Sequence, residues 1–288
     1  MGQLVSNEMR LIVFTDLDGS LLDHNSYSYD AAKPALDLLR NRDVPLILAS
    51  SKTAAEIAPL RAELGFVHCP AIVENGAGLL PAHMSLNASS GEVSEYQRIR
   101  AALKQLPSGL QGLFVGFGDW SDREIATQTG LDLKKVILAS KRFYSEPGLW
   151  RGDDGQRQEF ETWLEKKGIK ARQGGRYYTL SFGATKADQM RNIIDDLGWR
   201  DRPVLTIALG DAPNDIEMLE AADRAVIIKN PHGPTLPALS GEEAYPDHII
   251  RTQKSGPQGW NEAIQKLFGQ IYSNDAHRQT QNPKSQGD

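Results

Sequence analysis

The chain has 288 residues, of which 40% are hydrophobic, enough for one large domain or two modest ones with real cores. Its 32 basic and 37 acidic residues give a formal net charge of −5, which argues against a nucleic-acid or anionic-membrane surface. Cys69, the single cysteine, excludes an internal disulfide, and no cysteine or histidine spacing resembles a zinc site.

The ends of the chain and its hydropathy predict a cytoplasmic protein. No apolar run approaches the roughly 20 residues needed to span a bilayer. The first ten residues lack the apolar segment of a signal peptide. We expect residues 1–8 and 273–288, which are polar, to be flexible tails.

The first 80 residues alternate short apolar runs with amphipathic segments. The runs 11–14, 44–49 and 70–73 predict buried strands, and the segments 30–40 and 53–64 predict helices, the second capped by Thr53. This alternation predicts an α/β fold with a doubly wound, mainly parallel sheet.

The alternation stops near residue 81 and returns near residue 186. The stretch between them predicts helices at 92–106, 122–138 and 156–167, with apolar aromatic runs at 113–117 and 177–182. Further apolar runs at 204–209 and 225–228, with helices at 186–197, near Asn214 and at 259–268, then complete the first pattern. We therefore predict a core of residues 9–84 and 184–272 with an inserted α+β cap at 85–183.

Carboxylates follow two of the predicted core strands. Asp16 ends the first run and Asp18 follows on the same side of an extended backbone, with Gly19 allowing a tight turn. Asp211 and Asp215 follow the run 204–209. Because parallel strands of one sheet direct their carboxyl ends into a shared crevice, these oxygens predict a Mg²⁺ site that also receives phosphate.

A hydroxyl and a basic side chain also lie at the ends of predicted core elements. Ser50 ends the second strand, and Lys186 starts the helix before the last acidic strand. A phosphate beside the aspartates needs positive charge, which Mg²⁺ and Lys186 would supply, while Ser50 would bind the remaining phosphoryl oxygens. Taken singly, Ser50 and Asn214 are more typical of a helix cap and Lys186 of a solvated helix residue, while Asp16 and Asp18 are as typical of a turn. Their occurrence together in one chain favours a site for phosphate and Mg²⁺.

The segments DLDGS, ASSK, TKAD and GDAPND, in this order, resemble the four motifs of the haloacid dehalogenase-like phosphatases. The insert position is similar to that of their class with a type C2B cap on a Rossmann-like core. The resemblance implies that Asp16 is the nucleophile forming an aspartyl phosphate and that Asp18 is the acid and base. It also implies that Mg²⁺ is bound by Asp16, by the backbone carbonyl of Asp18 and by Asp211, with Asn214 and Asp215 in support.

Two positions depart from the family pattern. Ser20 stands where many relatives have Thr, and Ser51-Lys52 replaces a frequent Gly-Arg. The hydroxyl and the positive charge are kept in both cases.

The segments SSKT, IVENGAGL, KRFYSEPGLW and GGRYYTLSFGATK are similar, more narrowly, to mannosyl-3-phosphoglycerate phosphatases. That family hydrolyses the phosphate of a glycosyl-3-phosphoglycerate to give mannosylglycerate or glucosylglycerate. A substrate with a carboxylate and a sugar needs a cationic clamp and hydroxyl partners. The candidate substrate residues are Glu74, Asn75, Gly76, Arg142, Ser145 and Arg176.

Other functions stay open at this point. One is a phosphatase of other sugar phosphates, and another is a phosphomannomutase-like phosphotransferase, which uses similar acids but shields its phosphoenzyme from water. A third is a sugar-phosphate-binding regulator, against which a nucleophile beside an acid argues. We expect a small-molecule partner, with neither nucleic acid nor membrane.

Overall fold

The computed structural model describes residues 9–84, 93–174, 176–198, 203–245 and 247–280. Its central sheet is parallel, with the strand order β11-β10-β9-β1-β2. The apolar run at 11–14 becomes β1, an interior strand between β9 and β2, whose side chains are buried on both faces, as expected for a parallel sheet. The strands are β1 (Arg10–Thr15), β2 (Leu46–Leu48), β9 (Val204–Gly210), β10 (Arg224–Lys229) and β11 (Ile249–Ser255).

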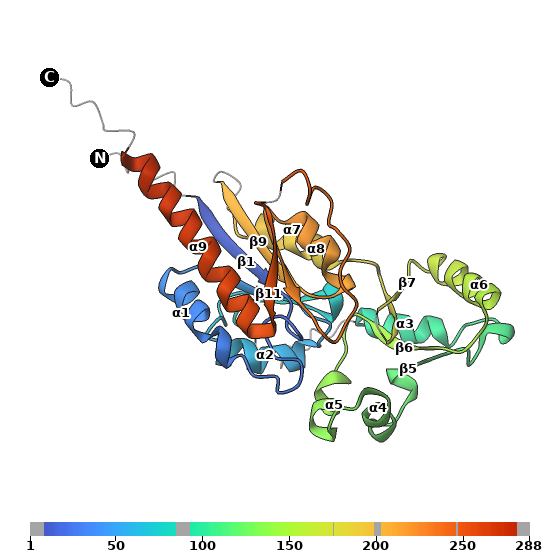
Figure 1. Ribbon diagram of the computed structural model, residues 1–288. Coiled ribbons are helices and arrows are strands. Elements are labelled where there is room, and N and C mark those ends of the chain that lie inside the picture. Colours follow the sequence, from blue (N-terminus) through green and yellow to red (C-terminus); the bar gives the residue numbers. More distant parts are fainter. Residues whose placement is uncertain (1–8, 85–92, 175, 199–202, 246, 281–288) are drawn as a thin grey trace.

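Helices cover both faces of this sheet, which confirms the doubly wound α/β fold. In Figure 1 the sheet lies between α9, which contacts α1, and the pair α7 and α8. Thr53 caps α2 through the amide of Glu56, as predicted. The core helices are α1 (Lys33–Asn41), α2 (Ala54–Glu63), α7 (Lys186–Asp196), α8 (Ile216–Ala221) and α9 (Gly256–Thr280).

The third predicted strand sits at the edge of the sheet. β3 (Ala71–Val73) pairs antiparallel with β4 (Gly78–Leu80), and a single parallel bridge between Ala49 and Ile72 joins it to the end of β2. The turn between β3 and β4, Glu74–Gly76, therefore lies beside the carboxyl end of β2.

The inserted segment folds as the predicted α+β unit, set to one side of the core in Figure 1. Its antiparallel sheet has the order β5-β6-β8-β7, and its own core includes Ile99, Phe160 and Leu180. We did not predict β6 and β7 as strands. The elements are α3 (Glu95–Leu103), β5 (Phe114–Gly116), α4 (Asp122–Thr129), α5 (Leu133–Ala139), β6 (Glu146–Trp150), α6 (Asp154–Glu165), β7 (Lys170–Gln173) and β8 (Tyr178–Ser181).

The C-terminal region differs from the prediction. The strand β11 was not foreseen, and α9 continues to Thr280, past residue 272, where we placed the start of a tail. The predicted apolar face of this helix is buried, and the indole of Trp260 donates to the Thr15 hydroxyl at 2.9 Å. Residues 1–8 and 281–288 of the predicted tails and residues 85–92 at the predicted cap boundary lie outside the described residues. Within the described ranges, no helix is both long and apolar enough to cross a membrane.

Candidate active site

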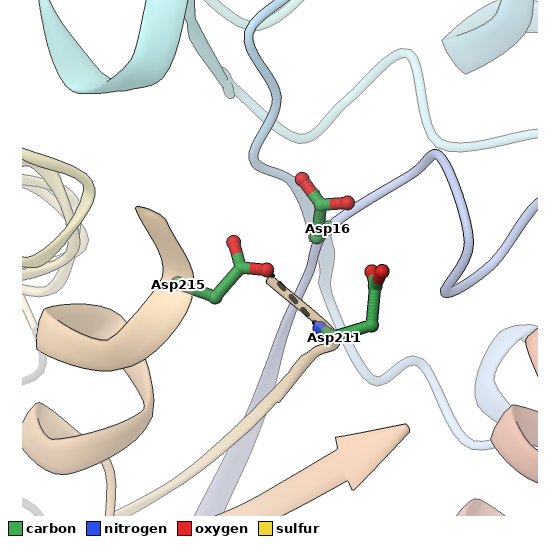
Figure 2. Close-up of side chains that lie close together, drawn as sticks. All are labelled: Asp16, Asp211 and Asp215. Carbon is green, nitrogen blue, oxygen red and sulfur yellow. Dashed lines mark hydrogen bonds between the residues drawn. The ribbon is translucent and has the colours of Figure 1, made fainter. Parts of the chain in front are cut away.

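Three aspartates meet at the carboxyl end of the central sheet. β1 and β9 are paired in register up to Thr15 and Leu209, so Asp16 and Asp211 leave the sheet next to each other. Asp215 comes from the short turn before α8. One carboxylate oxygen from each residue lies within 4.8 Å of the others, and Figure 2 shows the three side chains converging.

Lys186 lies between two of these carboxylates. Its ammonium donates to Oδ1 of Asp16 and to Oδ1 of Asp215, each at 2.7 Å, and its side chain is almost fully buried. The residue begins α7, whose N-terminus is capped by Thr185. Burial by itself disfavours the ammonium, but the two carboxylates outweigh it and raise the pKa of Lys186.

Two of the three aspartates, Asp16 and Asp211, have raised pKa values in this setting. Burial, with the nearby charge of Asp215, raises the pKa of Asp16 well above its ordinary value. Burial also raises the pKa of Asp211 to about 6, against the hydrogen bond from Ser20 that lowers it. One ammonium therefore stands against three carboxylates, and this buried excess of hard oxygen ligands fits a divalent cation such as Mg²⁺.

Asp211 is held in place from both sides. Its Oδ1 accepts from the hydroxyl of Ser20, and its Oδ2 accepts from the side-chain amide of Asn230, each at 2.7 Å. Gly19 adopts a φ of +87°, and a side-chain carbon there would lie 2.6 Å from Asp211 Oδ2. This close approach explains glycine at position 19.

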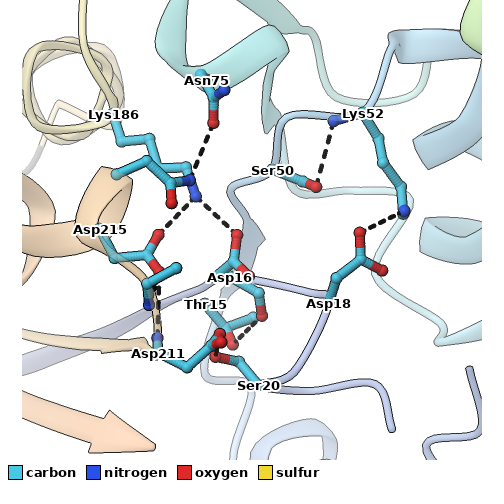
Figure 3. Close-up of polar contacts among 12 residues, drawn as sticks. Thr15, Asp16, Asp18, Ser20, Ser50, Lys52, Asn75, Lys186, Asp211 and Asp215 are labelled. Carbon is cyan, nitrogen blue, oxygen red and sulfur yellow. Dashed lines mark hydrogen bonds and ion pairs between the residues drawn. The ribbon is translucent and has the colours of Figure 1, made fainter. Parts of the chain in front are cut away.

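Asp18 lies outside the trio of aspartates. In Figure 3 its side chain turns toward Lys52 and away from Asp211, and Lys52 Nζ donates to its Oδ2 at 2.5 Å. Its Oδ1 is buried and has no hydrogen-bond partner within the described part of the chain. Lys52 thus holds one oxygen of Asp18, and the other is buried without a hydrogen-bond partner in that part of the chain.

Ser50 and Asn75 line the side opposite the aspartates (Figure 3). Ser50 is buried at the end of β2, where its hydroxyl accepts from the amide of Lys52 at 3.3 Å. Asn75 donates its amide to the Ser50 carbonyl at 2.9 Å, and its side-chain oxygen accepts from Asn214 at 3.1 Å. Asn75 thus joins the second strand to the loop after β9.

Glu74 connects the core to the cap. Its buried carboxylate accepts from the amides of Phe143 at 2.9 Å, Tyr144 at 3.3 Å and Ser145 at 2.8 Å, and from the Ser145 hydroxyl at 2.8 Å. The guanidinium of Arg142, itself buried, lies 3.3 Å away. The polar groups of Glu74, Arg142 and Ser145 therefore bind one another.

Arg176 is placed apart from that network. It is exposed on the connection between β7 and β8, where it donates to the carbonyl of Gln128 at 2.6 Å. Gly76 packs against the peptide between Thr185 and Lys186, and a side-chain carbon there would lie 2.1 Å from the Thr185 carbonyl carbon. Of the six substrate candidates, Glu74, Arg142 and Ser145 thus lie between core and cap. Asn75 and Gly76 lie beside Ser50 and Lys186, and Arg176 lies on the exposed surface of the cap.

Two contacts of the site were missing from our sequence prediction. Asn230 follows the apolar run of β10, so the rule that located Asp16 and Asp211 would also have pointed to it. Lys52 was noted only for its charge, because a pairing with Asp18 across 34 residues leaves no pattern in the sequence.

Comparison with known proteins agrees with this geometry. A family model described as haloacid dehalogenase-like hydrolase matches residues 13–129 and 149–238. A glucosyl-3-phosphoglycerate/mannosyl-3-phosphoglycerate phosphatase of Methanococcoides burtonii is 34% identical over 273 residues, which covers 91% of this chain and 98% of that protein.

Solved structures share the fold. The sucrose-phosphatase of Synechocystis sp. PCC6803, solved with sucrose and phosphate, has a TM-score of 0.56 at 15% identity. The match covers 90% of this chain and 98% of the sucrose-phosphatase chain. A subclass IIB sugar phosphatase of the haloacid dehalogenase superfamily has a TM-score of 0.57 at 17% identity, with the same coverage. Since the family model matches more than half of the chain, and the named relative spans nearly all of it, the protein belongs to the haloacid dehalogenase-like hydrolases and is a phosphoric monoester hydrolase.

Proposed function

We propose that this protein is a Mg²⁺-dependent phosphatase of glycosyl-3-phosphoglycerates, which releases phosphate and the mannosyl- or glucosylglycerate. The observation that carries the proposal is the 34% identity, over nearly its full length, to a phosphatase named for these two substrates. The acidic trio with Lys186 supports the chemistry. The assignment to the cytoplasm stays a prediction.

The proposed metal ligands are carboxylate oxygens of Asp16 and Asp211 and the backbone carbonyl of Asp18. Bound Mg²⁺ would offset the negative charge of the aspartates and of the substrate phosphate. The hydrogen bonds from Ser20 and Asn230 fix both oxygens of Asp211, so this ligand is oriented in advance. Asp215 acts in support, because it accepts from Lys186 and from the amides of Asp211 and Ala212.

The proposed reaction has two steps. A carboxylate oxygen of Asp16 attacks phosphorus, the bond to the glycerate oxygen breaks, and Asp18 gives its proton to that oxygen. Asp18 then takes a proton from water, whose oxygen attacks the aspartyl phosphate and frees phosphate and Asp16. We assign these proton transfers to the carboxyl group of Asp18, whose Oδ2 accepts from Lys52.

Lys186 and Ser50 are the proposed phosphate ligands. Lys186 holds Asp16 Oδ1 and carries the positive charge that a phosphate dianion needs beside carboxylates. Ser50 supplies a hydroxyl from the neighbouring strand end. Asn214 supports the site by binding Asn75.

The remaining substrate candidates fall into two groups. Arg176 is exposed on the cap and keeps its proposed role as a substrate contact. Glu74, Arg142 and Ser145 bind one another, so we propose that their contribution is to seat the cap. Asn75 and Gly76 shape the wall between Ser50 and Lys186.

Phosphate release from a panel of glycosyl-3-phosphoglycerates and simple sugar phosphates, with and without Mg²⁺, tests the proposal. We expect the highest kcat/KM on a glycosyl-3-phosphoglycerate and no turnover without metal. Preference for a sugar phosphate lacking glycerate would contradict the substrate assignment. Transfer of phosphate to a second sugar position, without release, would favour the phosphotransferase alternative.

Replacing the nucleophile gives the first mutational prediction. Asp16→Asn keeps the shape of the side chain but removes the attacking carboxylate, so we expect kcat to fall at least about 10³-fold, with the fold kept by circular dichroism. The control is Asp37→Asn, which changes an exposed carboxylate paired with Arg40 on α1. Full activity in Asp16→Asn would refute the aspartyl-phosphate route.

A further inference from the structure

Lys52 is a partly buried cation beside the proposed acid and base. It follows Ser50 at the end of β2, and its side chain is 20% exposed. One ammonium hydrogen goes to Asp18 Oδ2 at 2.5 Å. An ammonium has three donors, so Lys52 can bind a second anion while it holds Asp18.

A second lysine, from the cap, approaches the same place. The ring of Tyr27 lies 5.6 Å from Lys52 Nζ and 4.4 Å from the Nζ of Lys135 on α5. The Thr53 hydroxyl donates to the Leu138 carbonyl at 2.9 Å, which seats the end of α5 on the start of α2. Core and cap thus each contribute one ammonium group to a single aromatic ring.

The backbone and the preceding turn hold Tyr27 in this position. Its φ is 57°, a conformation that a large side chain seldom adopts, and the residue is 41% exposed. The turn before it is fixed by Asp23 Oδ1, which accepts from the amides of Asn25 at 3.1 Å and Ser26 at 2.8 Å. An exposed ring held in a costly backbone conformation between two cations indicates a binding surface.

The chemistry of the proposed substrate places a negative charge here. In a 3-phosphoglycerate unit the leaving oxygen is on C3 and the carboxylate is C1, so standard bond lengths keep them within roughly 5 Å of each other. Asp18 must come within hydrogen-bond distance of that oxygen to protonate it. The substrate carboxylate therefore lies close to a second carboxyl group, and this arrangement is unfavourable unless a cation stands beside both.

We propose that Lys52 and Lys135 form the subsite for the glycerate carboxylate, with Lys52 bridging that group and Asp18. The inference rests on the proposed function and names the residues that would let this phosphatase select acidic phosphate esters over neutral sugar phosphates. Lys135, which is half exposed, supplies the second charge from the cap.

The test compares two substrates on each enzyme variant. One is the glycosyl-3-phosphoglycerate, and the other is the same glycoside of glycerol 3-phosphate, in which a CH₂OH group replaces the carboxylate. The ratio of their kcat/KM values measures the preference for the carboxylate. Because both substrates report on one preparation, the ratio does not depend on how much of a variant is folded.

We expect Lys52→Gln to lower this ratio by about 10- to 100-fold, the worth of a charge-assisted hydrogen bond, and Lys52→Arg to restore most of it. Lys135→Gln should lower it by about 2- to 5-fold, as for a solvent-exposed ion pair. The control Lys134→Gln, which removes the neighbouring exposed lysine of α5, should leave the ratio unchanged.

Three outcomes would overturn the inference. If Lys52→Gln slows both substrates equally, Lys52 acts on Asp18 alone. If Lys135→Gln behaves like Lys134→Gln, the cap has no part in the subsite. If the wild-type enzyme shows no preference for the carboxylate, there is no such subsite. Failure of the proposed function looks different, because the wild type would then prefer a phosphate ester of another class to both glycosides.

Discussion

At the scale of single residues, the site is governed by the burial of opposite charges. Lys186 is kept charged by Asp16 and Asp215, while burial raises the pKa values of Asp16 and Asp211. The metal-free folded chain therefore binds a proton at Asp211 more tightly than the unfolded chain does. This group costs stability as the pH rises from 3.8 through about 6.

Protons and Mg²⁺ should compete for the same oxygens. Asp211 must lose its proton to bind metal, so the apparent Kd for Mg²⁺ should rise below pH 6 by up to about tenfold per pH unit, with Asp16 adding to the effect. Calorimetric titration of Mg²⁺ between pH 5 and 8 measures this. A Kd that stays constant across that range would exclude Asp211 as a ligand.

At the scale of elements, the turn Glu74–Gly76 packs against the start of α7 and so fixes the position of Lys186. All three residues have positive φ angles, of 51°, 59° and 91°. The Gly76 carbonyl accepts from Gln189 of α7 at 3.0 Å, and its α-carbon lies directly against the peptide before Lys186. The position of Lys186 thus depends on the absence of a side chain at residue 76.

Gly76→Ala tests this packing. The added carbon would lie 2.1 Å from Thr185 backbone atoms, so α7 must shift and we expect both lost activity and a free energy of unfolding lowered by about 3 kcal/mol or more. Gly112→Ala is the matched control: its φ is +76°, but nothing lies within 4 Å of the added carbon, so it should cost only about 1 kcal/mol. Equal losses in chemical denaturation would refute this role of the packing.

At the scale of the whole molecule, core and cap have separate hydrophobic clusters and meet through hydrogen bonds to Glu74 and through the Tyr144 side chain, which packs against the core. The cap has one cluster around Phe160 and a smaller one around Phe117, and the cluster of the core lies around β1 and Trp260. Glu74 bridges them by accepting from three consecutive cap amides, and Arg142 balances its charge. These hydrogen bonds join the cap to the turn Glu74–Gly76 of the core.

Removing this bridge should loosen the cap without unfolding it. In Glu74→Ala we expect hydrogen exchange at the amides of Phe143 and Ser145 to speed up by about tenfold or more, because each loses a buried acceptor. The amide of Gly118, which donates to Glu146 within the cap, is the internal reference and should not change. Unchanged protection at residues 143–145 would show that Glu74 does not hold the cap.

Periodic and local signals explain what could be predicted. The apolar runs of β1, β2, β9 and β10 and the spacing of helices gave the parallel sheet and the α+β insertion. β7 (Lys170–Gln173) was missed because it is polar and largely exposed, and β11 (Ile249–Ser255) because it is mostly polar and only partly buried, so burial leaves little pattern in their sequences. The extension of α9 to Thr280 was missed because its last residues are polar.

The sequence by itself determined that carboxylates end adjacent strands of one sheet, because strand ends and tight turns are local features. Only the tertiary structure decided that Lys52 pairs with Asp18, that Asn230 holds Asp211 and that Glu74 is committed to the cap. These contacts join residues 19 to 71 positions apart. Their partners are chosen by how the loops and the cap pack, and that packing leaves no periodic trace along the chain.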